Sequence, residues 1–401
     1  MAGAGIGELD GALLDGRYLV ESKIASGGTS TVYRGLDVRL DRPVAVKVMD
    51  ARFAGDEQFL TRFRLEARAV ARLKNPGLVV VYDQGFDARH PFLVMELVRG
   101  GTLRELLAER GPMPPHAVAA VLRPMLGGLA TAHGCGLVHR DVKPENVLIS
   151  DEGDVKIADF GLVRAVAAAG ITSAGVILGT AAYLSPEQVR DGPPNQADPR
   201  SDVYSTGILT YELLTGRTPF TGDSALSIAY QRLHNDVPPP SAAIDGVPPQ
   251  FDELVLRATA RNPAKRYADA IEMAADLEAI VDELGLPAFR VPAPSDSAQH
   301  RSAGLGRGRM AGRGPAPVGQ PTRQLTRGPG DWSAAQPAAE PDEYEYEPGS
   351  GEFAGIAMSD FVWARQRGRR TVLIWMAVVL ALTGLVATVG WTIGSNLSVL
   401  L

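Results

Sequence analysis

The chain has 401 residues and a formal net charge of −6 at neutral pH, which argues against nonspecific binding to nucleic acid through bulk charge. Hydrophobic residues make up 45% of the sequence, enough for a sizeable core in one large domain or in two or three average ones. The single cysteine, Cys135, excludes an internal disulfide, and we interpret it as a small buried apolar residue.

The first 16 residues hold neither a basic patch nor an apolar stretch of signal-peptide length, so we predict a flexible N-terminus at 1–16. Residues 17–285 have the composition of a folded domain. Short β-branched and apolar runs dominate to about residue 97, interrupted by one helical pattern at 56–73. Later patterns are mainly helical, at 115–134, 202–214, 250–260 and 269–284. A β-rich lobe followed by an α-helical lobe predicts an α+β fold.

A run of small residues, Ile24-Ala25-Ser26-Gly27-Gly28, lies between two β-type segments near the start of this domain. Small residues let a hairpin approach a ligand closely and point backbone N–H groups at phosphate oxygens. Taken alone, the same run also fits an ordinary tight turn. The segment therefore predicts a phosphate-binding loop only if other residues of the chain supply matching chemistry.

A lysine follows in a strand that buries one face, Val44-Ala45-Val46-Lys47. The helix at 56–73 carries an apolar stripe, and Glu66 falls on that stripe three residues after Phe63. A carboxylate on a buried face is costly unless a cation pairs with it. We therefore predict an ion pair between Lys47 and Glu66; the alternative is an accidental polar residue on a helix face.

The strongest pattern is the run from Val138 to Asn146, which reads Val-His-Arg-Asp-Val-Lys-Pro-Glu-Asn. The proline makes a helix through this stretch unfavourable, so we expect a loop that presents Asp141, Lys143 and Asn146 together. A carboxylate base, an ammonium for phosphate and an amide for a metal ion suit in-line phosphoryl transfer to a hydroxyl. Asp159, in the turn Asp159-Phe160-Gly161, is suited to hold Mg²⁺ beside the phosphates.

The composition changes near the end of the folded domain. Residues 286–370 are rich in Pro, Gly, Ala, Ser and Arg, with an acidic stretch at 342–347. Too few apolar residues are present to offset the conformational entropy of the chain. We therefore predict a disordered linker at 286–370.

Residues 371–393 carry no charge, and at about 1.5 Å per residue they reach about 34 Å, enough to cross a bilayer core of about 30 Å. Arginines precede this segment closely and nothing basic follows it. The positive-inside rule then places residues before the span in the cytoplasm and 394–401 outside as a short extracytoplasmic tail. We predict a single-pass transmembrane helix in the cell membrane; the alternative, a buried core helix, lacks a domain to bury it.

With these motifs in this order and spacing, residues 17–285 resemble a eukaryotic-type Ser/Thr protein kinase catalytic domain. The whole chain, with its catalytic domain, tether, single span and short tail, is similar to a member of the actinobacterial transmembrane kinases. The resemblance implies a bilobal fold, ATP and Mg²⁺ (or Mn²⁺) as cofactors, and transfer of the γ-phosphoryl group to Ser or Thr of protein substrates. It also implies a homodimer through the small lobe, and direct binding of nucleic acid is not expected.

The resemblance assigns roles to residues that the motifs match. Gly27 and Gly28 would cover the phosphates, Lys47 would hold the α- and β-phosphates, and Asp141 would accept the substrate hydroxyl proton. The remaining implied contacts are Val32 and Ala45 on adenine, Met95 as gatekeeper, Glu96 to Val98 as the hinge, Lys143 on the γ-phosphate, and Asn146 and Asp159 on the metal. Ala25 departs from the usual glycine, and we expect its methyl group to restrict φ and to weaken ATP affinity.

Peptide substrates are implied by a second set of matches: Thr180, Ser185-Pro186-Glu187, Asp202 and Arg266. Residues Asp159 to Glu187 match the activation segment of the family. We predict autophosphorylation of Thr172, or secondarily of Ser173, with the phosphate docking on Arg140; the alternative is that both are ordinary exposed hydroxyls.

Two other functions compete with a protein kinase. A catalytically dead scaffold would need a lost lysine, base or metal ligand, but Lys47, Asp141, Asn146 and Asp159 are all present. A small-molecule phosphotransferase of related fold would lack the segment that docks peptides.

Overall fold

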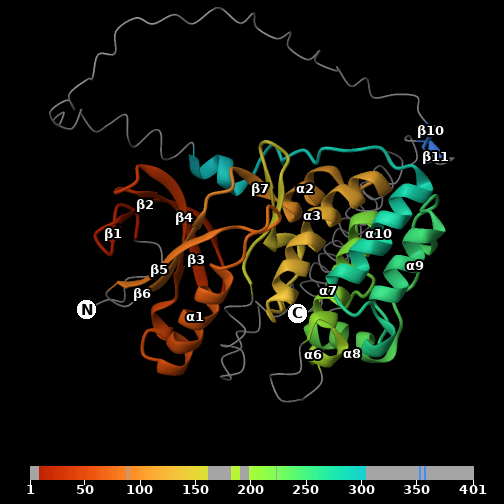
Figure 1. Ribbon diagram of the computed structural model, residues 1–401, viewed down its shortest axis with the longest axis horizontal. Helices are drawn as coiled ribbons and strands as arrows, with labels where there is room; N and C mark the ends of the chain where they lie inside the picture. The colour runs from red at the N-terminus through yellow and green to blue at the C-terminus, as the bar shows by residue number, and fades with distance from the viewer. Residues whose placement is uncertain are drawn as a thin grey trace, which may run out of the picture.

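The computed structural model describes residues 9–87, 90–160, 182–189, 198–222, 224–303, 352–353 and 356–357. Two lobes lie side by side, a sheet with one helix and a larger body of helices (Figure 1). The predicted α+β class and the bilobal arrangement are therefore confirmed.

The small lobe is built on a six-stranded antiparallel sheet with the order β1-β2-β3-β4-β6-β5. Its strands are β1 (Leu13–Leu14), β2 (Tyr18–Ser26), β3 (Ser30–Asp37), β4 (Arg42–Met49), β5 (Val81–Asp87) and β6 (His90–Glu96). One 3-10 turn, η1 (Ala51–Phe53), leads from β4 into α1 (Glu57–Val70). Asp56 caps α1 by accepting a hydrogen bond from the backbone N–H of Phe59.

Strand β4 shows why Lys47 faces the interior. Alternate residues of a strand point to opposite faces of a sheet. Val44, Val46 and Val48 pack in an apolar cluster on one face of the small-lobe sheet. Ala45 and Met49 pack on the other face, against phenylalanines of η1 and α1. Lys47 shares that second face, and its relative exposure is 5%.

The large lobe contains the elements from β7 to α10. A three-stranded sheet, β7-β8-β9, lies where the lobes join, with β7 (Gly100–Thr102), β8 (Val147–Ser150) and β9 (Val155–Ile157). The helices are α2 (Leu103–Arg110), α3 (Pro115–Gly134), α6 (Pro186–Val189), α7 (Pro199–Thr215), α8 (Ala225–His234), α9 (Pro249–Ala258) and α10 (Ala270–Leu284), with 3-10 turns η2 (Pro144–Asn146), η3 (Pro240–Ala242) and η4 (Pro263–Lys265). A short pair of strands, β10 (Glu352–Phe353) and β11 (Ile356–Ala357), occurs later in the chain.

A segment after α10 differs from the sequence prediction. Residues 286–303, which we call the strap, run from the end of α10 back along the molecule to the small lobe (Figure 1). Val291, Ser297 and Ser302 in the strap are buried. The linker that we predicted from residue 286 therefore starts no earlier than residue 304.

Cys135 also differs from its interpretation as a buried residue. It caps the C-terminal end of α3, and its side chain is exposed. Its place at a helix end explains the error, because the apolar pattern of α3 stops just before it.

Candidate active site

The predicted adenine contacts lie together in one apolar cluster. Ala45, Met95 and Val98 are buried in it, and Val32 packs against them. Leu148 of β8 joins the same cluster from the large lobe, so apolar side chains from both lobes meet there. Sequence analysis missed Leu148, although an apolar residue two positions after Asn146 in a β-type run was the available signal.

The hinge between the lobes carries a polar anchor beside this cluster. Glu96, the first hinge residue, forms an ion pair of 2.7 Å with Lys156 of β9. Its backbone N–H donates to the carbonyl of Val80 at 2.8 Å. The hinge is therefore attached to β9 and to the loop before β5.

The glycine turn between β2 and β3 is closed by a hydrogen bond from the N–H of Gly27 to the carbonyl of Ser30 at 2.8 Å. Arg52 of η1 donates to the carbonyl of Gly28. Ala25 lies before the turn in extended backbone, paired with Val32, and it does not belong to the described residues with positive φ. The expected restriction by its methyl group is therefore wrong, because the backbone there suits any residue. Ile24 and Ser26 lie on the same strand.

Lys47 forms an ion pair with Asp159, with 2.9 Å between Nζ and Oδ1. Burial opposes ionisation of Asp159, but the nearby charge of Lys47 lowers the pKa of that carboxyl below its ordinary value. Among the ion pairs of the described residues, none joins Lys47 to Glu66. The predicted Lys47–Glu66 pair is thus not formed in this arrangement, because Asp159 holds the ammonium.

Glu66 instead has a buried carboxylate oxygen, Oε2, without a hydrogen-bond partner in the described part of the chain. Burial raises the pKa of Glu66, and the positive charges of Arg140 and Arg62 partly offset this. The charge of Glu66 thus interacts with Arg140, the arginine beside the predicted base. A buried carboxylate oxygen without a hydrogen-bond partner costs free energy, so Glu66 destabilises α1 in this arrangement.

The predicted catalytic loop brings its three polar side chains together. Lys143 Nζ lies 2.8 Å from Oδ2 of Asp141. Asn146 donates from Nδ2 to the backbone carbonyl of Asp141 at 2.8 Å and to its Oδ2 at 3.0 Å. The proline at 144 begins the 3-10 turn η2, which turns Asn146 back toward Asp141. The prediction that these residues lie in one loop is confirmed.

Asp202 of α7 binds the backbone of this loop through its carboxylate. Its carboxylate accepts hydrogen bonds from the N–H of His139 at 2.6 Å and of Arg140 at 2.7 Å. Arg140 has a φ of 67°, a left-handed conformation that is unfavourable for a side chain of its size. The buried carboxylate therefore stabilises a backbone turn that the loop would not adopt alone.

His139 connects the loop to the segment that carries Asp159. Its Nε2 lies 2.9 Å from the carbonyl oxygen of Ala158, and its Nδ1 accepts from the N–H of Asp141 at 3.2 Å. These two partners require a proton on Nε2 and none on Nδ1. His139 thus contacts the backbone of Asp141 and of Ala158, the residue before Asp159. Asp159 has a φ of 62°, in the left-handed region.

The residues present fit a nucleotide with a divalent metal ion. Carboxylate and amide oxygens, as on Asp159 and Asn146, are ligands that Mg²⁺ prefers. The ammonium groups of Lys47 and Lys143 both lower the pKa of Asp159 through their positive charge. The apolar cluster around Ala45 supplies a dry place for a base, and the two ammonium groups match the negative charge of a triphosphate.

A second group of residues anchors the segment expected to dock peptides. Arg266 donates to both carboxylate oxygens of Glu187, each at 2.8 Å. Burial opposes ionisation of Glu187, yet the hydrogen bonds and charge of Arg266 lower its pKa to about 2. Glu187 and Arg266, two of the residues that the family resemblance matched, are therefore paired.

Arg232 of α8 is a further anchor, which sequence analysis missed. It is fully buried, with 0% relative exposure, and its Nη2 donates to the carbonyl of Ala182 at 2.7 Å. A hydrogen bond to Tyr204 also acts on it, and Arg266 lies over the ring of that tyrosine at 4.9 Å. Arg232 holds Ala182 and Arg266 holds Glu187, both in the described residues 182–189 of the segment expected to dock peptides. Tyr204 contacts both arginines and so links the two anchors. Nothing in the local pattern around Arg232 distinguishes it from an exposed helix arginine.

Several predictions lie outside the described residues: Thr172, Ser173, Thr180, Gly161 and the span at 371–393. Within the part of the chain that the structure describes, no helix combines the length and the apolar character needed to cross a bilayer.

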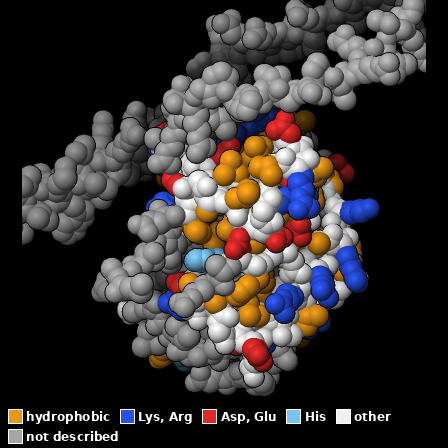
Figure 2. Space-filling view, turned by 90° about the vertical axis from the view of Figure 1, so that its left-hand side faces the viewer, with side chains coloured by type: hydrophobic (Ala, Val, Ile, Leu, Met, Phe, Trp, Pro, Cys, Tyr) orange, Lys and Arg blue, Asp and Glu red, His pale blue; other side chains and the backbone are white. Residues whose placement is uncertain are grey.

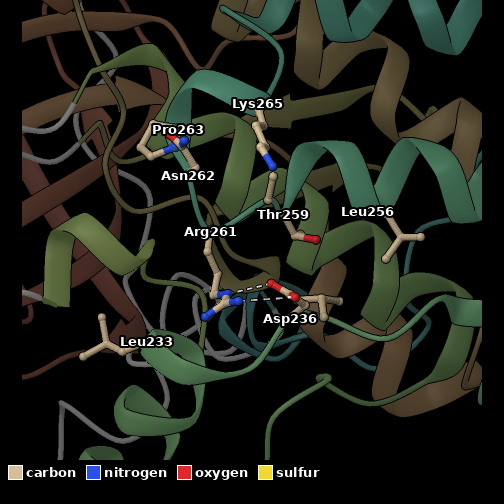
Figure 3. A pocket seen from close by; sticks show the side chains of 10 residues that line it. Leu233, Asp236, Leu256, Thr259, Arg261, Asn262, Pro263 and Lys265 are labelled. Carbon is tan, nitrogen blue, oxygen red and sulfur yellow. Dashed lines mark hydrogen bonds and ion pairs between the residues drawn. The ribbon is translucent and has the colours of Figure 1, made fainter.

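A separate cavity of about 640 Å³ lies in the large lobe between α8, α9 and η4 (Figure 3). Arg261 reaches across it to Asp236, with 2.6 Å between Nε and Oδ1, and Lys265 points into it from η4. None of its lining residues belongs to the predicted nucleotide site.

Comparisons with known proteins agree with this geometry. Residues 18–276 match the family model described as a protein kinase domain. The chain is 76% identical over 396 residues to the serine/threonine-protein kinase PknL of Mycobacterium tuberculosis, covering 98% of each chain. It is 46% identical over 271 residues to PknB of the same species, covering 66% of this chain and 43% of PknB. The solved PknI kinase domain of M. tuberculosis superposes with a TM-score of 0.53 at 27% identity, covering 70% of this chain and 99% of that one.

Proposed function

Because the chain belongs to the protein kinase family and is a serine/threonine protein kinase, we propose that Asp141 is the base of its phosphoryl transfer. The observation that carries this proposal is the hydrogen-bonded group of Asp141, Lys143 and Asn146 beside the Lys47–Asp159 pair. Asp141 accepts the proton of the substrate hydroxyl while Lys143 steadies the γ-phosphate. Catalysis of this kind depends mainly on positioning and on stabilising charge.

The family uses ATP with a divalent metal ion, and for this chain we assign that ion as Mg²⁺ or Mn²⁺, held by Asn146 and Asp159. The bound metal would neutralise charge that develops on the phosphates. Adenine would lie between Ala45 and Val32 on one side and Leu148 on the other, next to Met95. The apolar cluster that these residues form supports this assignment.

The hinge and the glycine turn complete the nucleotide assignment. Backbone groups from Glu96 to Val98 would bind the edge of adenine, and Ile24, Ala25 and Ser26 would border the base as the strand enters the turn. Gly27 and Gly28 would cover the phosphates. The closed turn at Gly27 supports a short lid of this kind.

Activation would require an exchange of partners at Lys47. In the structure its ammonium binds Asp159, whereas productive binding needs Lys47 on the α- and β-phosphates and paired with Glu66. Phosphorylation of Thr172, or secondarily Ser173, would bring a phosphate to Arg140. The favourable charge interaction between Glu66 and Arg140 supports competition between that carboxylate and the phosphate.

We also propose a membrane-anchored signalling kinase, with the catalytic domain in the cytoplasm and a single span at 371–393. The apolar sequence of that segment and the arginines before it support this location. Its substrates would be proteins with Ser or Thr acceptors.

A homodimer through the small lobe is the proposed means of autophosphorylation between two copies. Large apolar side chains are exposed there, with relative exposures of 49% for Leu13, 44% for Val38 and 58% for Leu40. Figure 2 views the molecule from the side of the small lobe and shows orange side chains dispersed among charged ones. Such a mixed surface suits a reversible contact.

The test is incubation of the full chain with [γ-³²P]ATP, Mg²⁺ and a generic basic protein. Label should appear on the chain and on the added protein, and should be lost in Asp141→Asn and in Lys47→Met. Asp245→Asn, at an exposed position away from the site, is the matched control and should label normally. A wild-type chain that folds but labels no polypeptide would refute the proposal.

A further inference from the structure

The strap joins both lobes and the hinge between them, beyond the residues that match the kinase family model. In the large lobe, Val291 is buried in the core at 2% exposure. The ring of Phe289 meets that of His116 edge to face at 5.0 Å. The N–H of Ser295 then donates to Glu109 of α2 at 2.7 Å. The strap is therefore fixed to the large lobe before it reaches the hinge.

At the large-lobe end of the hinge, the strap packs directly on two glycines of β7. Ser297 is fully buried and donates from Oγ to the carbonyl of Gly100 at 2.5 Å. A Cβ added to Gly101 would lie 2.4 Å from Cγ of Pro294 and 2.7 Å from Cβ of Ser297. No side chain larger than hydrogen fits there without a shift of the strap. The close approach thus depends on residues of the hinge and of the strap together.

Ser297 also begins the last turn of the strap. Its Oγ accepts a hydrogen bond from the N–H of His300 at 3.0 Å, as expected for the residue that caps a helix. The next N–H, that of Ala298, donates to Glu105 of α2 at 2.8 Å. One serine therefore orders the helical end of the strap and holds the hinge carbonyl.

That helical end reaches the small lobe. Ser22 of β2 donates from Oγ to the carbonyl of Ser302 at 3.2 Å, and both residues are buried. Gln299 is also buried beside them. A single continuous segment thus connects the large lobe, the hinge and the small lobe.

Strand β7, which the strap contacts, leads to the nucleotide site. Gly100 and Gly101 belong to β7, which pairs with β8, and Thr102 of β7 lies opposite Leu148. Leu148 contributes to the adenine cluster, and Val98 precedes β7 by two residues. Motion of β7 would therefore displace apolar contacts on two sides of the base.

We propose that the strap is a positioning element for nucleotide binding, and that Ser297 is its central positioning residue. By fixing β7 and the two lobes it reduces the conformational freedom that binding would otherwise remove. Release of the strap would weaken ATP binding without changing the groups that carry out phosphoryl transfer. This inference rests on the proposed nucleotide site.

The experiment uses the full chain with Ser297→Ala, with Gly101→Ala, and with both substitutions together. Gly101→Ala acts from the hinge side, because its methyl group displaces the strap. Hydrogen exchange at residues 295–302 reports whether the strap is released. Ala288→Ser is the matched control, since it changes an exposed residue of the same strap by one hydroxyl group.

We expect Ser297→Ala to raise the KM for ATP about fivefold, the effect of losing one hydrogen bond. Gly101→Ala should raise it at least as much, because its methyl group displaces the strap. The double variant should raise it further, whereas kcat and the KM for the protein substrate stay within about twofold, as for an effect confined to nucleotide binding. A double variant with a released strap and an unchanged KM for ATP would overturn the inference, as would a strap that stays protected in that variant. Failure of the wild-type chain to bind ATP would instead refute the proposed function.

Discussion

Replacing Glu187 by Gln should destabilise the large lobe strongly, because it leaves a buried guanidinium without its carboxylate. Arg266 has a fully buried side chain, and that of Glu187 is 17% exposed. The pKa of Glu187 falls from 4.5 to about 2 in the folded chain, and a shift of this size corresponds to about 3 kcal/mol. Removing one member of a buried pair generally costs about 3–5 kcal/mol. For a domain of this size the melting temperature should fall by roughly 6–12 °C.

The pH dependence has a definite sign. A carboxyl group with a lowered pKa contributes stability above its unfolded value, here 4.5, and loses it as the pH falls toward about 2. The difference in unfolding free energy between wild type and Glu187→Gln should therefore be constant from pH 8 to 5 and shrink below pH 4.5. Urea unfolding and thermal scans across this range measure it.

The matched control is Glu278→Gln, at an exposed pair in which Arg123 and Glu278 are 49% and 46% exposed. Exposed pairs contribute about 0–1 kcal/mol, so this variant should melt close to wild type. Equal melting temperatures for the two variants would show that the Glu187 argument is mistaken. A Glu187→Gln difference that does not change between pH 5 and 3 would contradict its electrostatic basis.

Three further substitutions test other parts of the site. Glu66→Gln should stabilise the nucleotide-free chain at pH 8 by about 1 kcal/mol, because burial of the charged form is relieved. That gain should vanish on acidification, since the raised pKa of Glu66 already favours the proton there; melting curves at several pH values check this, while the labelling rate should fall. Arg232→Lys cannot bind both the Ala182 carbonyl and Tyr204, so we expect the KM for protein substrate to rise about tenfold at constant KM for ATP, measured by steady-state kinetics. Ala25→Gly should change the KM for ATP by less than about twofold, because the backbone of Ala25 is already extended; a large gain in affinity would contradict this.

Much of the catalytic loop could be predicted because its determinants are local. Pro144 forbids a helix and begins a 3-10 turn, so Asn146 returns to Asp141 over a few residues. The face of β4 that holds Lys47 followed equally directly from the alternation of Val44, Ala45 and Val46.

The partner of Lys47 could not be read in the same way. Two carboxylates, on Glu66 and Asp159, come from segments far apart in the chain, and the choice between them depends on where α1 rests against the sheet. Local patterns establish that Glu66 faces inward, but not the distance to the ammonium.

The strap was missed for a related reason. Its Pro, Ala and Ser residues look like those of a linker, and its order comes from contacts with residues more than a hundred positions away, such as Gly100 and Glu105. Composition records the apolar content of a segment but not whether a glycine elsewhere leaves room for it.

The path of the strap has a mechanical consequence. The chain passes Ser302 beside β2, so traction applied beyond residue 303 is delivered to the small lobe and not to the end of α10. A pull there would detach the strap from residue 303 backward, opening the bond of Ser302 first, then that of Ala298, and then that of Ser297. The force would act on these hydrogen bonds one after another. The strap would therefore detach under a weaker force than one that unfolds the helices of the large lobe.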